Sequence, residues 1–223
     1  MVDKLNFVLI GASSDLAKEF IKINKKHNLN LISSNKLSDS HNHLYVDDYI
    51  NDINKILSFC ENIDNPIIIF FNGYLKENRP LQLPSEIEIQ KTFIINYLIP
   101  YTLTKSFMSN NLKVKKFVYI SSFAAVKPRF KNFIYGYCKK LLEDSVLSQN
   151  LDNVLILRFG KINTTMSEAH SKTVFDLKKD TAANIISKKI MTSTGLKYAN
   201  IYTKLLAIIV LVLPKAVFKY LKI

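Results

Sequence analysis

Short apolar runs alternate along the chain with longer segments in which apolar residues recur at helical spacing. The runs predict β-strands at residues 6–10, 29–33, 44–46, 66–71, 116–120, 153–157 and 199–202. The longer segments predict helices at residues 15–24, 50–57, 86–108, 134–148 and 179–191, followed by an apolar, basic tail from residue 204. Strands that alternate with helices in this way form βαβ units. We therefore expect an α/β fold with one doubly wound parallel sheet and helices on both faces.

Composition favours a single globular domain. The 223 residues are 48% hydrophobic and 22% charged, which is enough apolar material for a substantial core. Cys60 and Cys138 cannot form a disulfide framework, and no Cys/His spacing predicts a metal site. The first residues, MVDKLNFVLIGASS, do not fit a signal peptide. We expect a reduced, cytoplasmic protein without a bound metal.

The net charge of +13 raises the question of a nucleic-acid partner. The lysines are scattered or paired, as on solvated helix faces, and the chain is rich in Lys, Asn and Ile, as AT-rich coding would produce. We expect no nucleic-acid partner. A phosphorylated substrate or an anionic membrane surface explains the same charge more simply.

The first predicted strand runs into Gly11 and then a helix, through the sequence Gly-Ala-Ser-Ser-Asp-Leu-Ala. A glycine here permits a tight turn, and the N–H groups of a helix N-terminus bind a diphosphate. Asp15 and Ala17 stand where a dinucleotide-binding motif would have further glycines. Because any strand-to-helix turn can carry Gly and Ser, this signal is weak by itself.

A second motif, Tyr-x-x-x-Lys, is formed by Tyr135 and Lys139 at the start of a predicted helix. The two side chains lie one turn apart on one helix face, where an ammonium group lowers the pKa of a phenol. The predicted strand before it ends at Ser122, 13 residues upstream of Tyr135. An aromatic residue and a lysine at this spacing also occur by chance, so the order of the motifs carries the argument.

This order resembles the short-chain dehydrogenases/reductases, over nearly the whole chain. The resemblance implies a Rossmann-type fold and an Asn-Ser-Tyr-Lys tetrad made of Asn96, Ser122, Tyr135 and Lys139. In that family the tyrosine is the acid/base for hydride transfer between a nicotinamide cofactor and a carbonyl or alcohol. The serine orients the reacting oxygen, the lysine binds ribose and tunes the tyrosine, and the asparagine supports a water relay.

The resemblance also implies which residues bind NAD(P). Beyond Tyr135 and Lys139 they are Gly11, Ser13, Ser14, Asp15, Leu16, Ser34, Asn35, Asp47, Asn72, Gly73, Ile162 and Thr164. Asp48 replaces Asp47 if the register shifts by one residue. Phe71 and Phe159 depart from the family's asparagine and proline. Residues 32–36 contain no acid to bind a ribose 2′-hydroxyl, so NADP(H) is favoured over NAD(H).

The substrate is less constrained. The motifs and the basic tail are similar to decaprenylphosphoryl keto-pentose reductases of polysaccharide biosynthesis, which implies reduction of a keto-sugar on a lipid- or nucleotide-phosphate carrier. The alternatives are a 3-oxoacyl or general ketone reductase, and an idle, cofactor-sensing protein of the same fold. Residues 165–176 form the expected substrate loop, with Met166, His170 and Phe175 as pocket candidates.

The expected organisation is a dinucleotide-binding and catalytic domain at residues 1–203 and an apolar basic tail at residues 204–223. The run at 205–213 is too short to span a membrane, which takes about 18 residues. It can pack on the domain, or lie with its lysines on the inner face of a membrane. The family resemblance also implies a homodimer or homotetramer formed through the helices at 86–108 and 135–148.

Overall fold

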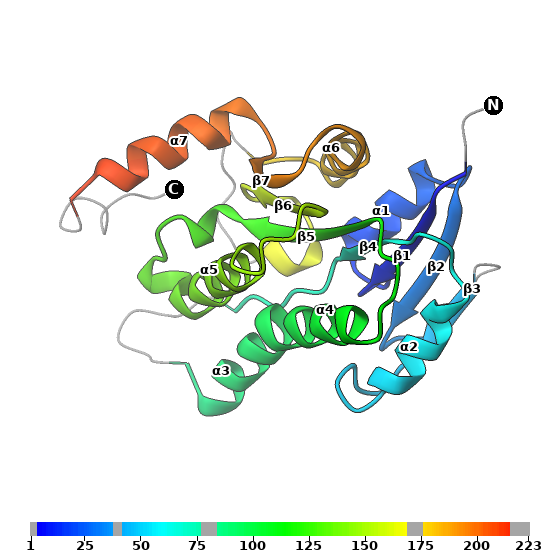
Figure 1. Cartoon of the computed structure of the whole chain (residues 1–223). Helices are drawn as coiled ribbons and strands as arrows, with labels where there is room; N and C mark the ends of the chain where they lie inside the picture. Colours follow the sequence, from blue (N-terminus) through cyan, green and yellow to red (C-terminus); the bar gives the residue numbers. More distant parts are fainter. Residues whose placement is uncertain (1–3, 38–41, 77–83, 169–175, 215–223) are drawn as a thin grey trace.

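The computed structural model describes residues 4–37, 42–76, 84–168 and 176–214. Seven strands form one sheet in the order β3-β2-β1-β4-β5-β6-β7, and every neighbouring pair is parallel (Figure 1). The strands are β1 (Asn6–Ile10), β2 (Asn28–Ser33), β3 (Asn42–Tyr45), β4 (Ile67–Phe70), β5 (Lys116–Ser122), β6 (Val154–Phe159) and β7 (Gly195–Tyr198). The expected doubly wound parallel sheet is confirmed.

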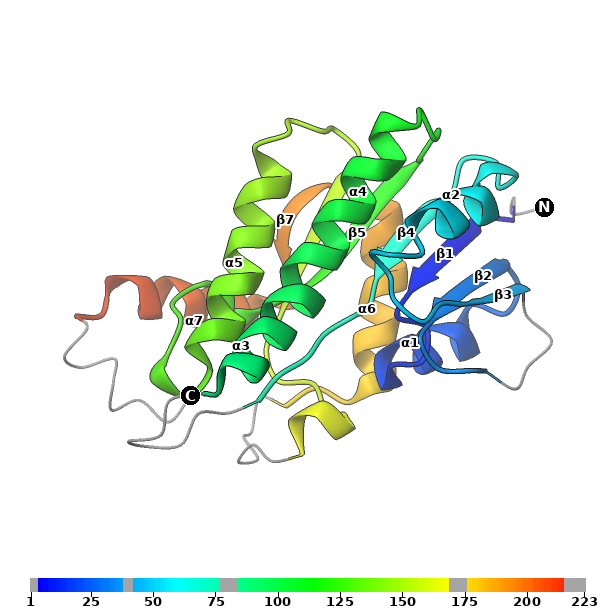
Figure 2. The same ribbon diagram turned by 90° about the horizontal axis from the view of Figure 1, so that it is seen from below.

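Helices cover both faces of the sheet (Figures 1 and 2). The α-helices are α1 (Asp15–Ile23), α2 (Ile53–Glu61), α3 (Glu86–Phe93), α4 (Ile99–Ser109), α5 (Phe133–Leu147), α6 (Lys179–Thr192) and α7 (Ile201–Val212). The short helices are η1 (Ile94–Leu98), η2 (Phe123–Ala125), η3 (Phe130–Asn132) and η4 (Thr165–Ser167). One core lies between the sheet and α1 with α6, and a second lies between the sheet and α2, α4 and α5.

The central strands explain why the sheet is sandwiched. All four residues of β4, Ile-Ile-Ile-Phe, are buried, as expected for a strand covered on both faces. Successive side chains point to opposite faces, so Ile67 and Ile69 join the first core while Ile68 and Phe70 join the second. Phe70 also stacks on Tyr119 of β5 with ring centroids 4.9 Å apart. The sheet is thereby fixed between its two helical layers.

The end of the chain differs from the sequence-based expectation. The predicted strand at 199–202 is wrong, because β7 ends at Tyr198 and α7 begins at Ile201. The cause is the side chain of Asn200, whose Oδ1 accepts a hydrogen bond from the Thr203 backbone N–H at 2.8 Å and caps the helix. The boundary expected between residues 203 and 204 therefore falls inside α7, and residues 215–223 of the tail lie outside the described residues.

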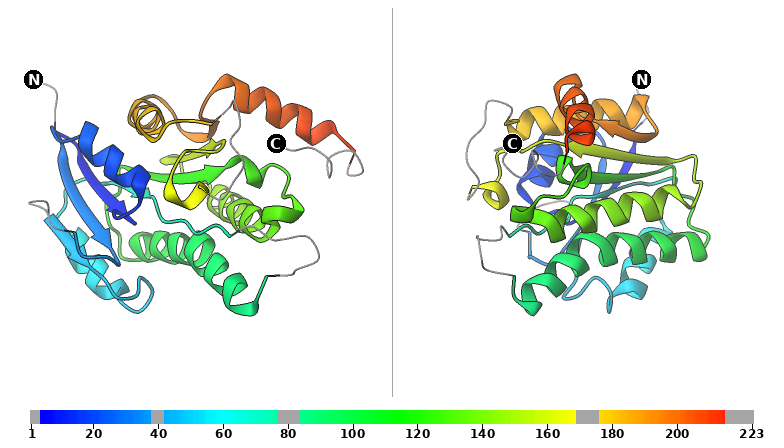
Figure 3. Two further views of the ribbon diagram at one scale, coloured as in Figure 1. Left: turned by 180° about the vertical axis from the view of Figure 1, so that it is seen from behind. Right: turned by 90° about the vertical axis from the view of Figure 1, so that its left-hand side faces the viewer.

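Helix α7 lies at the β7 end of the molecule, far from β3 (Figure 3). Ala207 and Val210 are buried against Val126 of the segment after β5. Among the described helices, none has the length and apolar character needed to cross a membrane. The described residues also contain no cluster of His, Cys, Asp and Glu suited to a metal ion. Cys60 and Cys138 are both buried free thiols.

Candidate active site

A cleft of about 2580 Å³ opens along the carboxyl ends of the strands. The strand order reverses between β1 and β4, and this edge is where open α/β sheets bind ligands. All but one of the site residues expected from the sequence line this cleft: Gly11, Ser13, Ser14, Asp15, Leu16, Ser34, Asn35, Asp47, Asn72, Gly73, Ser122, Tyr135, Lys139, Ile162 and Thr164. The exception is Asn96, which is fully buried.

The turn between β1 and α1 forms one wall of the cleft. Gly11 has φ +79°, and a Cβ at this position would lie 2.7 Å from the Asn72 backbone nitrogen. Only glycine fits both the conformation and the close approach of the two strand ends. Ser14 then caps α1, its Oγ accepting a hydrogen bond from the Ala17 N–H at 3.3 Å. The N-terminus of α1 therefore faces the cleft as an anion-binding feature.

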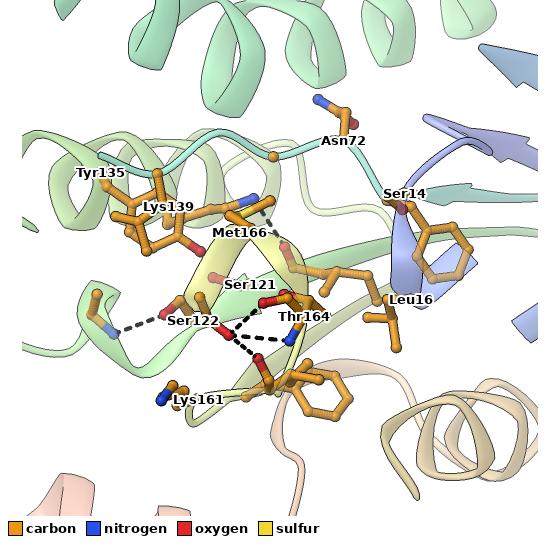
Figure 4. Close-up of a pocket in the computed structure, with 18 of the residues that line it drawn as sticks. Ser14, Leu16, Asn72, Ser121, Ser122, Tyr135, Lys139, Lys161, Thr164 and Met166 are labelled. Carbon is orange, nitrogen blue, oxygen red and sulfur yellow. Dashed lines mark hydrogen bonds between the residues drawn. The ribbon is translucent and has the colours of Figure 1, made fainter. Parts of the chain in front are cut away.

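Ser122, Tyr135 and Lys139 come together on the opposite wall of the cleft (Figure 4). Ser122 is the last residue of β5, and the other two lie one turn apart on α5. Lys139 Nζ donates a hydrogen bond to the Ile120 carbonyl at 3.1 Å and lies 5.8 Å from the centre of the Tyr135 ring. Gly136 allows this packing, because a Cβ there would lie 2.7 Å from the Ala124 carbonyl oxygen.

Burial sets the protonation of this group. It raises the pKa of Tyr135 to about 12, with the hydrogen bond to Ser122 lowering the pKa and the charge of Glu143 raising it. Burial also lowers the pKa of Lys139 to about 8. The net pKa of Tyr135 is therefore raised above that of a free phenol, chiefly by burial. Tyr135 is therefore a protonated phenol at neutral pH.

Asn96 lies in η1, a π-helical segment that interrupts the single helix expected at 86–108. Its Nδ2 donates to the carbonyl oxygens of Tyr74 at 2.7 Å and Thr92 at 2.9 Å. Asn72, after β4, donates to the carbonyl of Ile95 in the same segment. The Asn96 amide thus fixes the backbone behind the cleft and is already engaged, so the side chain itself does not contact Lys139.

The β2 and β3 ends form the far part of the cleft. Asn35 Nδ2 donates to Ser13 Oγ at 3.1 Å, which joins this part to the turn after β1. Asp48 accepts two backbone hydrogen bonds at 2.8 Å, from Ile50 and Asn51, and is thereby committed to its own turn. Asp47 accepts only the Tyr45 hydroxyl in the described structure, at 2.7 Å. Asp47 therefore keeps more hydrogen-bonding capacity for a ligand than Asp48 does.

The segment after β6 closes the cleft from the side. Ser167 Oγ lies 2.6 Å from the Ile162 carbonyl and accepts from the Thr164 N–H at 3.1 Å, which holds a compact turn. Lys161 pairs with Asp176 at 3.0 Å and anchors the base of the expected substrate loop. Met166 lines the cleft. His170 and Phe175, the other two pocket candidates, lie outside the described residues.

Two parts of the site were not predicted from the sequence. The first is a buried network beside Tyr135 and Lys139, in which Glu143 of α5 accepts from Ser121 Oγ at 2.5 Å and from Arg158 Nε at 2.9 Å. An acid four residues after Lys139 on the buried helix face is a signal that could have revealed it. The second is α7, whose Leu205 and Ile209 line the cleft. Nothing in their spacing points to that role.

Comparison with known proteins shows likeness in structure and not in sequence. The sequence matches no family model and no curated protein. A short-chain dehydrogenase from Burkholderia cenocepacia J2315, solved in complex with NADP, is similar with a TM-score of 0.77 and 13% identity over 96% of this chain and 100% of that chain.

Two further structures agree. Thermoplasma acidophilum aldohexose dehydrogenase has a TM-score of 0.68 and 14% identity, over 87% of this chain and 92% of that chain. A 4-hydroxyisoleucine dehydrogenase complexed with NADH has a TM-score of 0.70 and 18% identity, over 86% of this chain and 96% of that chain. At such low identities the likeness establishes the fold. The chain therefore has the Rossmann-type fold of the short-chain dehydrogenases.

Proposed function

We propose that the protein is an NAD(P)H-dependent oxidoreductase of the short-chain dehydrogenase/reductase type that reduces a carbonyl. The observation that carries this proposal is the arrangement of Ser122, Tyr135 and Lys139 across one cleft from the Gly11 turn. Two motifs more than a hundred residues apart thus meet in the order that the resemblance implies. The known proteins of this fold include dehydrogenases solved with NADP and with NADH.

The residues present fit a dinucleotide. Gly11 forms the tight turn packed against Asn72, and the capped N-terminus of α1 that follows offers N–H groups to a diphosphate. The cleft exceeds the roughly 300–1,000 Å³ of a usual small-molecule pocket, so it has room for a cofactor and a substrate together. Ile162 and Thr164 would hold the nicotinamide end, and Lys139 the adjacent ribose. When bound, the cofactor supplies the hydride.

Tyr135 acts as the proton donor in this proposal. Its raised pKa keeps the phenol protonated at neutral pH, which suits reduction, where the carbonyl oxygen must gain a proton. Ser122 orients the same oxygen by a hydrogen bond, and the Lys139 ammonium stabilises the phenolate left after transfer. Asn96 contributes by holding the backbone around Tyr74, and a water relay would use backbone groups there rather than its amide.

The cofactor preference proposed here is NADP(H) over NAD(H). Ser34, Asn35 and Lys36 are all exposed at the end of β2, and Lys36 lies 5.8 Å from the centre of the Tyr45 ring. Hydroxyl, amide and ammonium groups together suit a 2′-phosphate, whereas an acid at this point would repel it. Asp47 would contact the adenosine.

A keto-sugar on a phosphate-linked carrier is the proposed substrate. The support is the wall formed by α7, where Leu205, Leu206 and Ile209 line the cleft next to the catalytic group. An apolar wall beside a polar reaction centre suits a molecule with a polar head and an apolar tail. The same wall would accept an acyl chain, so a 3-oxoacyl or general ketone reductase is the second candidate.

The apolar surface of α7 extends beyond the cleft, and we take it as the site of contact with an anionic membrane. Ile208, Leu211 and Val212 are 51%, 58% and 78% exposed, an unusual amount of apolar surface for a free protein. Lys204 is exposed on the same helix, and the sequence after it adds lysines without an acid. Such a helix binds in the membrane interface. This would place the protein on the inner face of a membrane.

A homodimer or homotetramer through α4 and α5 is part of the proposal. These helices run side by side across the sheet (Figure 2), and both carry exposed apolar residues. Met108 of α4 is 38% exposed, and Tyr137 and Leu141 of α5 are 60% and 43% exposed. A second copy would cover this surface.

The direct test is reduction of carbonyl compounds by the purified protein, followed by the loss of NADPH absorbance. Keto-sugars with and without a lipid phosphate, 3-oxoacyl thioesters and simple ketones form the panel. Turnover of any member supports the oxidoreductase, and preference for lipid-linked keto-sugars supports the proposed substrate. If the protein binds NADPH or NADH and reduces no member of the panel, the idle, cofactor-sensing protein of the same fold is favoured. If it binds neither cofactor, the proposal is wrong.

A further inference from the structure

Asp15 is the residue that departs most from a glycine-rich motif, and its side chain crosses the cleft. It is the first residue of α1, on the diphosphate side. Its Oδ2 accepts hydrogen bonds from the backbone N–H of Thr165 at 2.8 Å and from Thr165 Oγ1 at 2.9 Å. The two residues are 150 positions apart in the sequence. The contact therefore joins the N-terminus of α1 directly to the segment that follows β6, on the other wall of the cleft.

The far side of this contact is the turn that carries Ile162 and Thr164. The turn is braced from within by Ser167, which is itself buried. The two hydrogen bonds from Thr165 to Asp15 add a contact between this turn and α1, so the position of the turn depends on α1. Hydrogen bonds to a charged acceptor are about twice as strong as neutral ones. The pKa of Asp15 is lowered, chiefly by the Thr165 N–H, so the carboxylate is charged at neutral pH.

The direction of the carboxylate also matters for an anionic ligand. A negative side chain at this turn would repel a diphosphate if it pointed along the α1 axis. Its two bonds to Thr165 turn it toward the opposite wall instead, and Lys179 and Lys18 contribute positive potential nearby. The motif's glycine is thus replaced by a residue that spans the cleft.

We propose that Asp15 is a positioning residue that clasps Thr165 across the cleft and slows release of the dinucleotide bound beneath. The inference rests on the proposed function, because it needs a nicotinamide cofactor in this cleft. With the clasp formed, the turn stays close to α1 and Thr164 is held ready for the nicotinamide end. With the clasp broken, the two walls separate and the cofactor leaves sooner.

The test begins without cofactor, by amide hydrogen exchange of the turn. Asp15→Ala should speed exchange in residues 162–168 by about tenfold, equivalent to about 1.4 kcal/mol, and leave β6 unchanged. Asp15→Asn keeps an acceptor oxygen and should stay within about threefold of the natural chain. The matched control is Asp180→Ala, which removes an exposed first-turn carboxylate from α6 and should change nothing. Unchanged exchange in Asp15→Ala overturns the clasp.

The second measurement is the dissociation rate of bound NADPH, by stopped-flow displacement. Asp15→Ala should release it about tenfold faster, and Asp15→Asn should restore slow release, while the pH profile of turnover stays the same. A release rate within twofold of the natural chain, or an Asp15→Asn as fast as Asp15→Ala, overturns the role in cofactor retention. If the natural chain binds no nicotinamide cofactor, the proposed function fails, and the exchange result still reports separately on the clasp.

Discussion

Glu143 of α5 and Arg158 of β6 form an ion pair, with Arg158 Nε 2.9 Å from one carboxylate oxygen and 3.1 Å from the other. Their side chains are 1% and 12% exposed. Arg158 also donates to the Tyr198 hydroxyl at 3.0 Å, so the pair links α5 to β6 and β7. Helix α5 is therefore fixed to the sheet by charge as well as by packing.

Loss of one partner of this pair should be costly. Arg158→Leu leaves the buried Glu143 carboxylate without its cation, and the free energy of unfolding should fall by about 3–5 kcal/mol. Arg158→Lys should lower the free energy of unfolding by less, because lysine keeps the positive charge and loses only the bidentate geometry. Urea denaturation measures both. The control, Lys140→Ala, breaks the exposed pair with Asp144 and should cost at most about 1 kcal/mol. A loss below 1 kcal/mol for Arg158→Leu would contradict the prediction.

Tyr135→Phe should reduce turnover by at least about 100-fold and leave NADPH affinity within about threefold, because it removes only the transferable proton. Steady-state kinetics and a fluorescence titration measure the two effects. Tyr137→Phe, in an exposed residue two positions along the same helix, serves as the control and should be active. Lys139→Ala should impair both turnover and cofactor binding. A Tyr135→Phe protein with a tenth of the natural activity would refute the assignment.

The pH dependence of kcat/KM should reflect the ionisation of Lys139. Because burial lowers its pKa to about 8, the free protein loses the ammonium above that pH while Tyr135 stays protonated. The kcat/KM for reduction, which follows ionisations of the free protein, should therefore be level at neutral pH and fall above about pH 8. Lys139→Arg keeps its charge, so the residual activity of that variant should not fall there. A level profile to pH 10 in the natural chain would contradict this reading.

Cofactor titrations should show NADPH binding at least as tightly as NADH. Lys36→Ala should weaken NADPH binding about tenfold and leave NADH binding unchanged, since only NADPH carries the 2′-phosphate. Ser34→Asp should shift the preference toward NADH by placing an acid at the end of β2. Lys26→Ala, in an exposed lysine between α1 and β2, is the control. A strong NADH preference in the natural chain would refute the assignment of this subsite.

Membrane contact can be tested by co-sedimentation with anionic liposomes. The natural chain should pellet at low salt and be released as salt rises, because the lysines contribute electrostatic attraction. A double variant with Ile208→Glu and Leu211→Glu should remain in the supernatant, as should a chain ending at Lys204. Both substituted residues are exposed, so the fold should survive.

The control for liposome binding is Ile87→Glu. It changes a residue of α3 that is 76% exposed and should pellet like the natural chain. If the natural chain also stays in solution, α7 belongs to the fold or to an oligomer.

Local patterns were sufficient for most of the architecture. The apolar runs of β1, β4, β5 and β6 and the periodic segments of the helices specified the parallel sheet, because burial on both faces demands continuous apolar strands. The order of Ser122, Tyr135 and Lys139 likewise predicted that they meet. The sequence-based prediction was wrong at residues 199–202. It placed a strand there, but the side chain of Asn200 caps a helix that begins at Ile201.

Long-range contacts determined the rest. The contact between Asp15 and Thr165 and the pairing of Glu143 with Arg158 depend on how strand ends and helices meet, and the sequence does not show which partner each acid takes. The raised pKa of Tyr135 also belongs to the folded state, because its phenol is buried only once the core has closed around it. The chain order sets which groups are available, and three-dimensional packing sets which of them touch, which are charged and which face the cleft.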